Sequence, residues 1–289
     1  MRSTGMNRRL PMSATTPLRQ RTIDTLKLGH YSERTITTYI DWLIRLGEHY
    51  HCSPAELTNE QVQDFLLYLI GERKLAWSTV NQALAAIRFL FEKVLGRPRA
   101  ELRVPARRKV TRRAGIYSMQ QVEQLLAAAQ NPKHRALLMC VYGAGLRVGE
   151  AVVLKPEHIE SARGLVRVEQ GKGRKDRYTI LPRRLLEELR DYYRYFHPRE
   201  WLFFGRDRSK PMPVGSAQKI FYLIRNRVGI NHGGIHTLRH CFATHLLEAG
   251  ADLFELKRMM GHSAIKTTSG YIHISKEHLQ SVPSPLDSL

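Results

Sequence analysis

Residues 236–250 read HTLRHCFATHLLEAG, and this stretch decides how the second half of the chain folds. Its apolar spacing predicts a helix over residues 237–249, on which His236, Arg239 and His240 fall within about 100° of one another around the axis. Apolar residues occupy most of the opposite side. The stretch alone leaves two interpretations open: these polar side chains bond backbone carbonyls near the helix start, or they face an anionic ligand.

The charge balance narrows the class of partner. The 289 residues include 46 Lys and Arg against 26 Asp and Glu, which gives a formal net charge of +20. Such an excess favours a polyanionic partner, with nucleic acid ahead of an anionic membrane surface. The longest apolar run, ALLMCVYGAGL, has 11 residues, and a membrane span needs about 18. We therefore expect a nucleic-acid-binding protein without a membrane-spanning helix.

Cysteine usage and the first residues indicate the compartment. The three cysteines, Cys52, Cys140 and Cys241, are odd in number and lack the spacing of metal ligands, so neither disulfides nor zinc sites are expected. The N-terminus has no apolar core of a secretory signal. We expect a cytoplasmic protein.

The first part of the chain is helical throughout. We predict a flexible leader over residues 1–16 and a compact four-helix unit over residues 17–96. Ser32 has the position of a helix N-cap, and Thr58 followed by Gln61 has the spacing of a capping box.

A basic stretch, RPRAELRVPARRKVTRR, follows at residues 97–113. It holds eight Lys and Arg with two prolines and no periodicity, as expected for an interdomain linker. Its 17 residues could span about 55 Å, at ~3.3 Å each. A solvated connector remains the alternative, but we favour a tether that follows DNA phosphates. The expected DNA contacts are Arg97, Arg99, Arg103, Arg107, Arg108, Lys109, Arg112, Arg113 and, further along the chain, Lys175.

The second domain is expected over residues 114–289. Segments 165–170 and 178–182 alternate like strands around GKGRKDR at 171–177, which indicates a hairpin, and helical patterns surround them. The predicted fold class is mainly α with a small antiparallel β-sheet.

Other polar residues interrupt apolar or glycine-bearing segments, and each has a structural alternative. Arg147, at the end of a hydrophobic helix, could pair with Glu150 three residues on. Lys172 could be an exposed turn lysine, and His262 could cap a helix. Tyr271 could be an ordinary half-buried tyrosine.

Four segments in this order resemble the motifs of one family: GLRVGE at 145–150, GKGRKDR at 171–177, HTLRHCFATHLLEAG at 236–250 and MGHSAIKTTSGY at 260–271. The chain resembles the tyrosine recombinases of the phage integrase family. It is similar to the Xer-like and transposon-associated members, because the interval from Lys172 to His236 lacks the helix that integron integrases insert. The resemblance implies an N-terminal SAM-like core-binding domain and a catalytic domain, arranged as a C-shaped clamp.

The resemblance implies that six residues of this sequence are catalytic. They are Arg147, Lys172, His236, Arg239, His262 and Tyr271. It implies that Tyr271 attacks a DNA phosphate and forms a 3′-phosphotyrosine link with a free 5′ hydroxyl. Two guanidiniums can stabilise the charge that builds on the phosphate oxygens without a metal ion, so no metal, ATP or other cofactor is expected.

The remaining roles follow from the same resemblance. His236 is the candidate base for the tyrosine proton, and Lys172 would protonate the departing 5′ oxygen. His262 would donate to a phosphate oxygen. Glu150 and His240 would support the two arginines.

The resemblance also implies partners. The first is double-stranded DNA, and the second is three further copies of the chain, in a homotetramer on two synapsed sites. An accessory directionality factor is a further candidate. The expected setting is a bacterial cytoplasm, in association with the nucleoid. Residues 275–281 are expected to form a short helix that docks on a neighbouring subunit, with a frayed terminus as the alternative. Gly270 stands where the family has an apolar residue, which predicts a mobile tyrosine segment.

Three other functions fit part of the sequence. A type IB topoisomerase would use similar residues on one duplex without strand exchange. A non-catalytic DNA-binding regulator would share the charge and the linker. A metal hydrolase would use histidines, namely His236, His240, His245 and His262, but Arg239 would repel a cation and the glutamate of a zinc-protease motif is missing.

Overall fold

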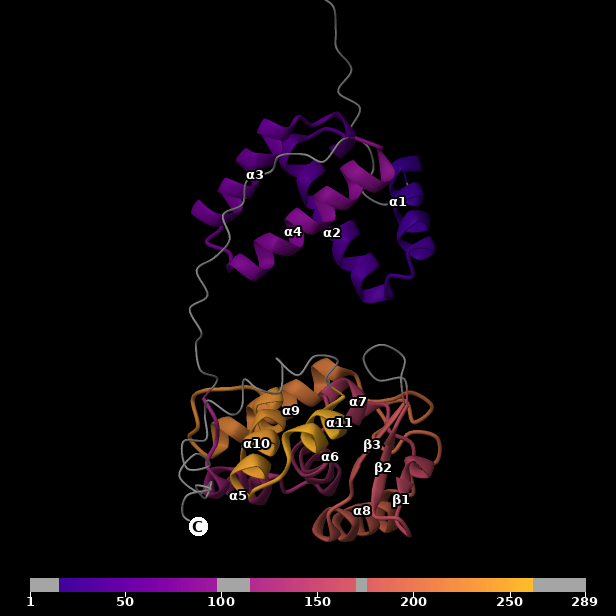
Figure 1. The fold of residues 1–289 in the computed structure, drawn as a ribbon, viewed down its shortest axis with the longest axis vertical. Coiled ribbons are helices and arrows are strands. Elements are labelled where there is room, and N and C mark those ends of the chain that lie inside the picture. Colours follow the sequence, from indigo (N-terminus) through magenta and orange to yellow (C-terminus); the bar gives the residue numbers. More distant parts are fainter. Residues whose placement is uncertain (1–15, 98–114, 170–175, 262–289) are drawn as a thin grey trace, which may run out of the picture. The chain divides into compact units, whose positions relative to one another are not determined.

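The computed structural model describes residues 16–97, 115–169 and 176–261. The chain divides into two compact units, residues 1–111 and 112–289. Within the described ranges, no helix is long and apolar enough to cross a membrane. Figure 1 shows the elements of each unit.

The first unit contains the four predicted helices. They are α1 (Pro17–Leu28), α2 (Glu33–Tyr50), α3 (Asn59–Gly71) and α4 (Trp77–Phe89), with a 3-10 turn η1 (Pro54–Glu56) and a π-helical turn η2 (Leu90–Val94). Ser32 caps α2, since its side chain accepts from the amide of Thr35. Thr58 and Gln61 form the predicted capping box of α3. Both sequence-based predictions of helix starts are therefore confirmed.

The core of the first unit lies between α2, α3 and α4. Leu46, Val62, Phe65 and Ile87 are almost fully buried there, and α2 packs along α4. Burying an aliphatic or aromatic side chain of this size contributes about 1.5–3 kcal/mol. The amphipathic pattern that predicted these helices is thus the pattern that packs them.

The second unit is mainly helical. Its elements are α5 (Met119–Ala128), α6 (Pro132–Gly143), α7 (Val148–Val152), η3 (Pro156–His158), β1 (Ile159–Glu160), β2 (Leu165–Val168), β3 (Arg177–Ile180), α8 (Arg183–Phe196), α9 (Val214–Arg227), α10 (Ile235–Glu248) and α11 (Leu253–Met260). The predicted fold class is confirmed. The sequence pattern missed the short elements α7, η3 and β1, which span five, three and two residues and are too short to show a period.

The sheet is antiparallel with the order β1-β2-β3. Val166 of β2 pairs with Thr179 of β3. The buried hydroxyl of Thr179 donates to the carbonyl oxygen of Ala144 at 2.9 Å. This bond fixes the hairpin against the loop between α6 and α7.

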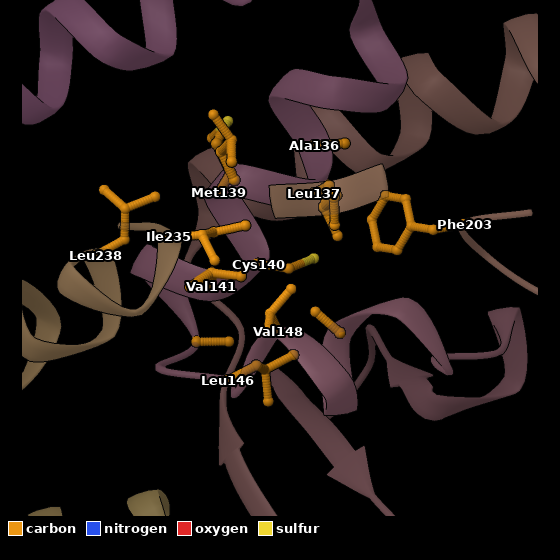
Figure 2. Packing of buried hydrophobic residues seen from close by; sticks show 14 of the residues in the cluster. Ala136, Leu137, Met139, Cys140, Val141, Leu146, Val148, Phe203, Ile235 and Leu238 are labelled. Atoms are coloured by element: carbon orange, nitrogen blue, oxygen red, sulfur yellow. The ribbon is translucent and has the colours of Figure 1, made fainter. Parts of the chain in front are cut away.

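Helix α6 is the centre of the core in the second unit. Figure 2 shows Leu137, Cys140 and Val141 of α6 among side chains from other elements, including Phe203 and Ile235. Helix α6 also packs on α8 and α10. Helix α7, which begins directly after Arg147, and helix α10, which carries His236 and Arg239, therefore both pack on this apolar helix.

One predicted helix boundary is wrong. We expected the helix of residues 132–146 to lead directly into Arg147, but α6 ends at Gly143. Gly145 has φ +62°, the left-handed region, and turns the chain out of the helix. Arg147 consequently lies at the N-cap of α7 and not at the end of a hydrophobic helix.

Candidate functional site

Helix α10 brings its polar face to the loop that precedes α7. Arg239 is buried, with 6% of its side chain exposed. Its Nη1 donates to the carbonyl oxygen of Gly145, and its Nη2 donates to that of Met260. Of the two interpretations of this helix face, bonding to backbone carbonyls is present for Arg239, and facing an anionic ligand stays a prediction. It also lies beside a carboxylate, with its Nη1 3.6 Å from Oε2 of Glu150.

Arg147 and Glu150 form a reciprocal pair at the start of α7. The backbone amide of Arg147 donates to Oε2 of Glu150 at 2.8 Å, and its Nη1 donates to Oε1 at 2.7 Å. The ion pair considered from the sequence is therefore present. It does not close off the guanidinium, since 26% of the Arg147 side chain is exposed.

Arg177, at the first position of β3, is the site residue that the sequence reasoning missed. Its Nη1 and Nη2 donate to Oε1 and Oε2 of Glu150 at 2.9 Å and 2.7 Å, a two-pronged bond. Only 10% of each side chain is exposed. A signal existed: strand alternation places Arg177 on the same face as the inward Thr179, and an arginine on a buried face needs an anionic partner.

The three arginines also bind the end of α11. Nε of Arg177 donates to the carbonyl oxygen of Met259 at 2.8 Å, Arg239 donates to that of Met260, and Nη2 of Arg147 lies 3.4 Å from that of Gly261. The last carbonyls of a helix lack partners inside the helix and carry partial negative charge. Three positive side chains from three elements thus bind three consecutive carbonyls.

The electrostatics of this cluster favour an anion. Burial alone would raise the pKa of Glu150, but the hydrogen bond and charge of Arg177, followed by the bonds from Arg147, lower it to about 2. Glu150 is therefore ionised at neutral pH. Three guanidiniums and one carboxylate leave a local charge of +2, in a site where Arg147 remains partly open.

The two histidines on α10 lie in the same positive environment. Burial, then the charges of Arg239 and Arg147, lowers the pKa of His236 below its ordinary value, against a smaller opposing effect of Glu150. Burial, His236 and Arg239 lower the pKa of His240. Both imidazoles are therefore mainly neutral at pH 7, and a neutral imidazole can accept a proton.

Five of the predicted supporting and catalytic residues are brought together by the fold. They are Arg147, Glu150, His236, Arg239 and His240. Lys172, Lys175, His262 and Tyr271 lie outside the described residues, as do Gly270, the segment 275–281 and the expected linker contacts from Arg99 to Arg113. His245, considered as a metal ligand, has its Nδ1 3.1 Å from the hydroxyl of Tyr142. Among the described residues, no three His, Cys, Asp or Glu side chains are grouped closely enough to hold a metal ion.

Arg97, at the end of the first unit, is held by that unit. Its guanidinium donates to the carbonyl oxygens of Ala55 and Leu57 and lies 4.7 Å from the ring centroid of Phe91. A contact between Arg97 and DNA stays a prediction, and the side chain has a packing role besides.

Comparison with protein families assigns both units. Residues 117–278 match the phage integrase family. Residues 18–101 match the SAM-like N-terminal domain of phage integrases. The two matches agree with the two compact units of the chain.

Similar proteins cover nearly the whole chain. The integrase/recombinase y4qK of Sinorhizobium fredii is 39% identical over 95% of this chain and 90% of its own length. The tyrosine recombinase XerC 2 of Ralstonia nicotianae is 33% identical over 90% of this chain and 79% of its own length.

Solved structures share the fold. The XerH site-specific recombinase bound to its difH substrate, in a pre-cleavage complex, is 21% identical with a TM-score of 0.69 and covers 91% of this chain and 82% of its own. The Tn1549 transposon integrase in complex with circular intermediate DNA is 16% identical with a TM-score of 0.71 and covers 91% and 97% of the two chains. At these identities the likeness concerns the fold alone.

Proposed function

Because the chain belongs to the phage integrase family, as a tyrosine recombinase that acts in site-specific DNA recombination, we propose that it cuts and rejoins DNA through a 3′-phosphotyrosine intermediate. The observation that carries this proposal is the convergence of Arg147, Arg177 and Arg239 on the single carboxylate of Glu150, which leaves a net local charge of +2. A phosphodiester in transfer needs such fixed positive donors on its non-bridging oxygens.

The guanidinium groups of these arginines can bind a phosphate more specifically than a single point charge could. A guanidinium stays charged and presents several N–H groups in one plane, so it can bind two phosphate oxygens at once. The carboxylate of Glu150 and the carbonyls of α11 hold the guanidiniums in place before DNA arrives. A preorganised donor loses little free energy to reorientation during the reaction.

Proton transfer can be assigned to residues of this chain. Tyr271 would lose its phenolic proton to His236, and the phenolate oxygen would form a bond to phosphorus as the bond to the 5′ oxygen breaks. Lys172 would give a proton to that oxygen, and His262 would donate to a phosphate oxygen, with His240 supporting Arg239. The lowered pKa of His236 keeps its imidazole neutral and able to accept the proton.

This scheme needs neither ATP nor a metal ion. The tyrosine ester conserves the energy of the broken phosphodiester, so the 5′ hydroxyl of a second duplex can attack it and restore a DNA strand. The charge that a metal would stabilise is instead stabilised by Arg147 and Arg239.

The proposed partner is double-stranded DNA. The basic stretch 97–113 would neutralise DNA phosphates. Each copy offers one Tyr271 and cuts one strand, and exchange between two duplexes requires four cuts, so we propose a homotetramer on two synapsed sites. A directionality factor stays a prediction.

The test is a trap for the covalent intermediate. The full-length chain would be mixed with a library of nicked duplexes, without ATP and with EDTA, and the ends bound to protein would be sequenced. We expect adducts through the 3′ phosphate for the wild type and none for Tyr271→Phe. Adducts that require a metal ion, or relaxation of supercoils without joining of a cut end to a second duplex, would contradict the proposal.

A further inference from the structure

We propose that Arg177 is a positioning residue for strand cleavage: it binds the Glu150 carboxylate on the protein side, so that Arg147 and Arg239 are held for the DNA phosphate. This inference rests on the proposed function and adds a residue to it. It starts from the contact between Arg177 and Glu150, which joins two elements 27 residues apart in the sequence.

The three arginines share Glu150 unequally. Arg177 uses both terminal nitrogens, one on each carboxylate oxygen. Arg147 uses one terminal nitrogen at 2.7 Å, and its second makes only a long contact of 3.4 Å with Gly261. Arg239 approaches no closer than 3.6 Å. The carboxylate is thus bound most fully by Arg177.

Hydrogen bonding, and not burial alone, distinguishes Arg177 from the other two arginines. The Arg177 and Glu150 side chains are almost enclosed, Arg239 is equally buried, and Arg147 is the most open of the three guanidiniums. Arg177 also donates its Nε to the Met259 carbonyl, so its three nitrogens all have protein partners. A side chain bound in this way acts on the reaction through Glu150 and not by touching DNA.

Charge gives the physical reason for the arrangement. Without Arg177, the ionised Glu150 would be neutralised by Arg147 and Arg239 alone, and it would compete with the phosphate for their N–H groups. A carboxylate and a phosphate favour the same planar donors. With Arg177 present, one positive charge offsets Glu150 and two remain for the substrate.

Arg177 also connects two segments that carry catalytic motifs. It lies five residues after Lys172 in the sequence, and Met259 lies three residues before His262. Gly261 allows close contact here: it has φ +60°, and a Cβ at this position would lie 2.9 Å from Cδ of Arg177. The start of β3 and the end of α11 are therefore tied by one side chain.

The test separates positioning from stability by removing charges in pairs. Arg177→Ala, Arg177→Lys, Glu150→Gln and the double variant Arg177→Ala/Glu150→Gln would be compared in single-turnover adduct formation on a nicked duplex. Non-covalent DNA affinity would be measured separately in a Tyr271→Phe background. We expect Arg177→Ala to slow adduct formation by about 10-fold to 100-fold, with the DNA Kd changed by less than about 3-fold. Arg177→Lys keeps the charge but not the two-pronged bond, so its rate of adduct formation should lie between those of the wild type and Arg177→Ala.

The double variant gives the decisive readout. Removing the Glu150 charge should restore about 5-fold or more of the rate lost in Arg177→Ala, because the competing carboxylate is gone. A role in stability alone predicts instead that the folded Arg177→Ala chain reacts at the wild-type rate and that the double variant restores only the free energy of unfolding. The matched control is Arg163→Ala. Arg163 lies beside the same sheet and pairs with Glu160 at 2.7 Å, but 61% of its side chain is exposed. The adduct-formation rate of this variant should stay within about 2-fold of the wild-type rate, since exposed pairs contribute little.

Each outcome bears on one of the two proposals. A wild-type chain that forms no adduct overturns the proposed function, and this inference with it. An active wild type with a normal rate in Arg177→Ala, or a double variant no faster than Arg177→Ala, overturns this inference alone. If Arg177→Ala does not fold by circular dichroism, a wild-type rate in Arg177→Lys overturns it instead.

Discussion

The guanidinium of Arg239 donates a hydrogen bond to the carbonyl oxygen of Gly145, 94 residues earlier in the chain. This bond joins α10 to the loop that carries Arg147. Because Arg239 is buried, its loss leaves carbonyl groups without their donor as well as removing a positive charge. The same side chain therefore supports the fold of the site and its proposed chemistry.

Arg239→Lys should nearly abolish strand cleavage while leaving the chain folded. Lysine keeps the charge but cannot reach the Gly145 and Met260 carbonyls together in the geometry of a guanidinium. We expect a loss of about 10²-fold to 10³-fold in single-turnover adduct formation and a destabilisation of about 1–3 kcal/mol. Arg183→Lys, in an exposed ion pair with Glu187, is the control, and equal rates in the two variants would refute the prediction.

Gly145→Ala should destabilise the second unit. Gly145 has φ +62°, and an added Cβ would lie 2.4 Å from ring atoms of Phe242. Strain in the left-handed region and the overpacked contact together should reduce the free energy of unfolding by about 2 kcal/mol or more. Chemical denaturation measures this change.

Gly149→Ala is the matched control for that experiment. A Cβ on Gly149 meets no atom within 4 Å, and the residue lies inside α7. Since alanine favours helix by about 1 kcal/mol over glycine, the variant should be neutral or more stable. Equal destabilisation of the two variants would show that the steric argument is wrong.

The contribution of Glu150 to the free energy of unfolding should decrease as the pH falls into the acid range. Its pKa is lowered from 4.5 to about 2 in the folded chain, so the contribution is complete above the unfolded value and is lost as pH falls toward 2. A shift of this size corresponds to a few kcal/mol, about 3 at most. The difference in unfolding free energy between wild type and Glu150→Gln should shrink between pH 5 and pH 3. Glu187→Gln, at an exposed pair, should show no such trend.

The rate of cleavage should report the protonation of His236. Burial, Arg239 and Arg147 lower the pKa of His236, so the neutral, proton-accepting form persists below the ordinary value of about 6.5. The single-turnover rate should therefore stay high at pH 6.5 and fall only at lower pH. His236→Gln should lose about 10²-fold or more in rate and lose this acid limb. If the rate of His236→Gln fell at low pH as the wild-type rate does, His236 would not be the proton acceptor. His197→Asn, at an exposed histidine, serves as control.

The sequence predicted most of the helices because their signals are local. Ser32, Thr58 and Gln61 occupy their expected caps, and the helix periods match the buried faces. The end of α6 was missed because an apolar run continues past Gly143, and apolarity alone does not show where φ changes sign. Gly145 was the available signal.

The sequence by itself predicted the kind of chemistry. Its arginine, lysine, histidine and tyrosine motifs, in a fixed order, resemble those of the phage integrase family, and this resemblance implies a phosphate as the reacting group. Only the tertiary structure decided which charges share a partner. Arg177, Arg147 and Arg239 come from β3, the α7 N-terminus and α10. They meet at Glu150 because α7 and α10 pack on α6, while β3 and α10 pack on α11. Contacts between distant segments depend on how apolar faces pack, and that information is not contained in any one segment of the chain.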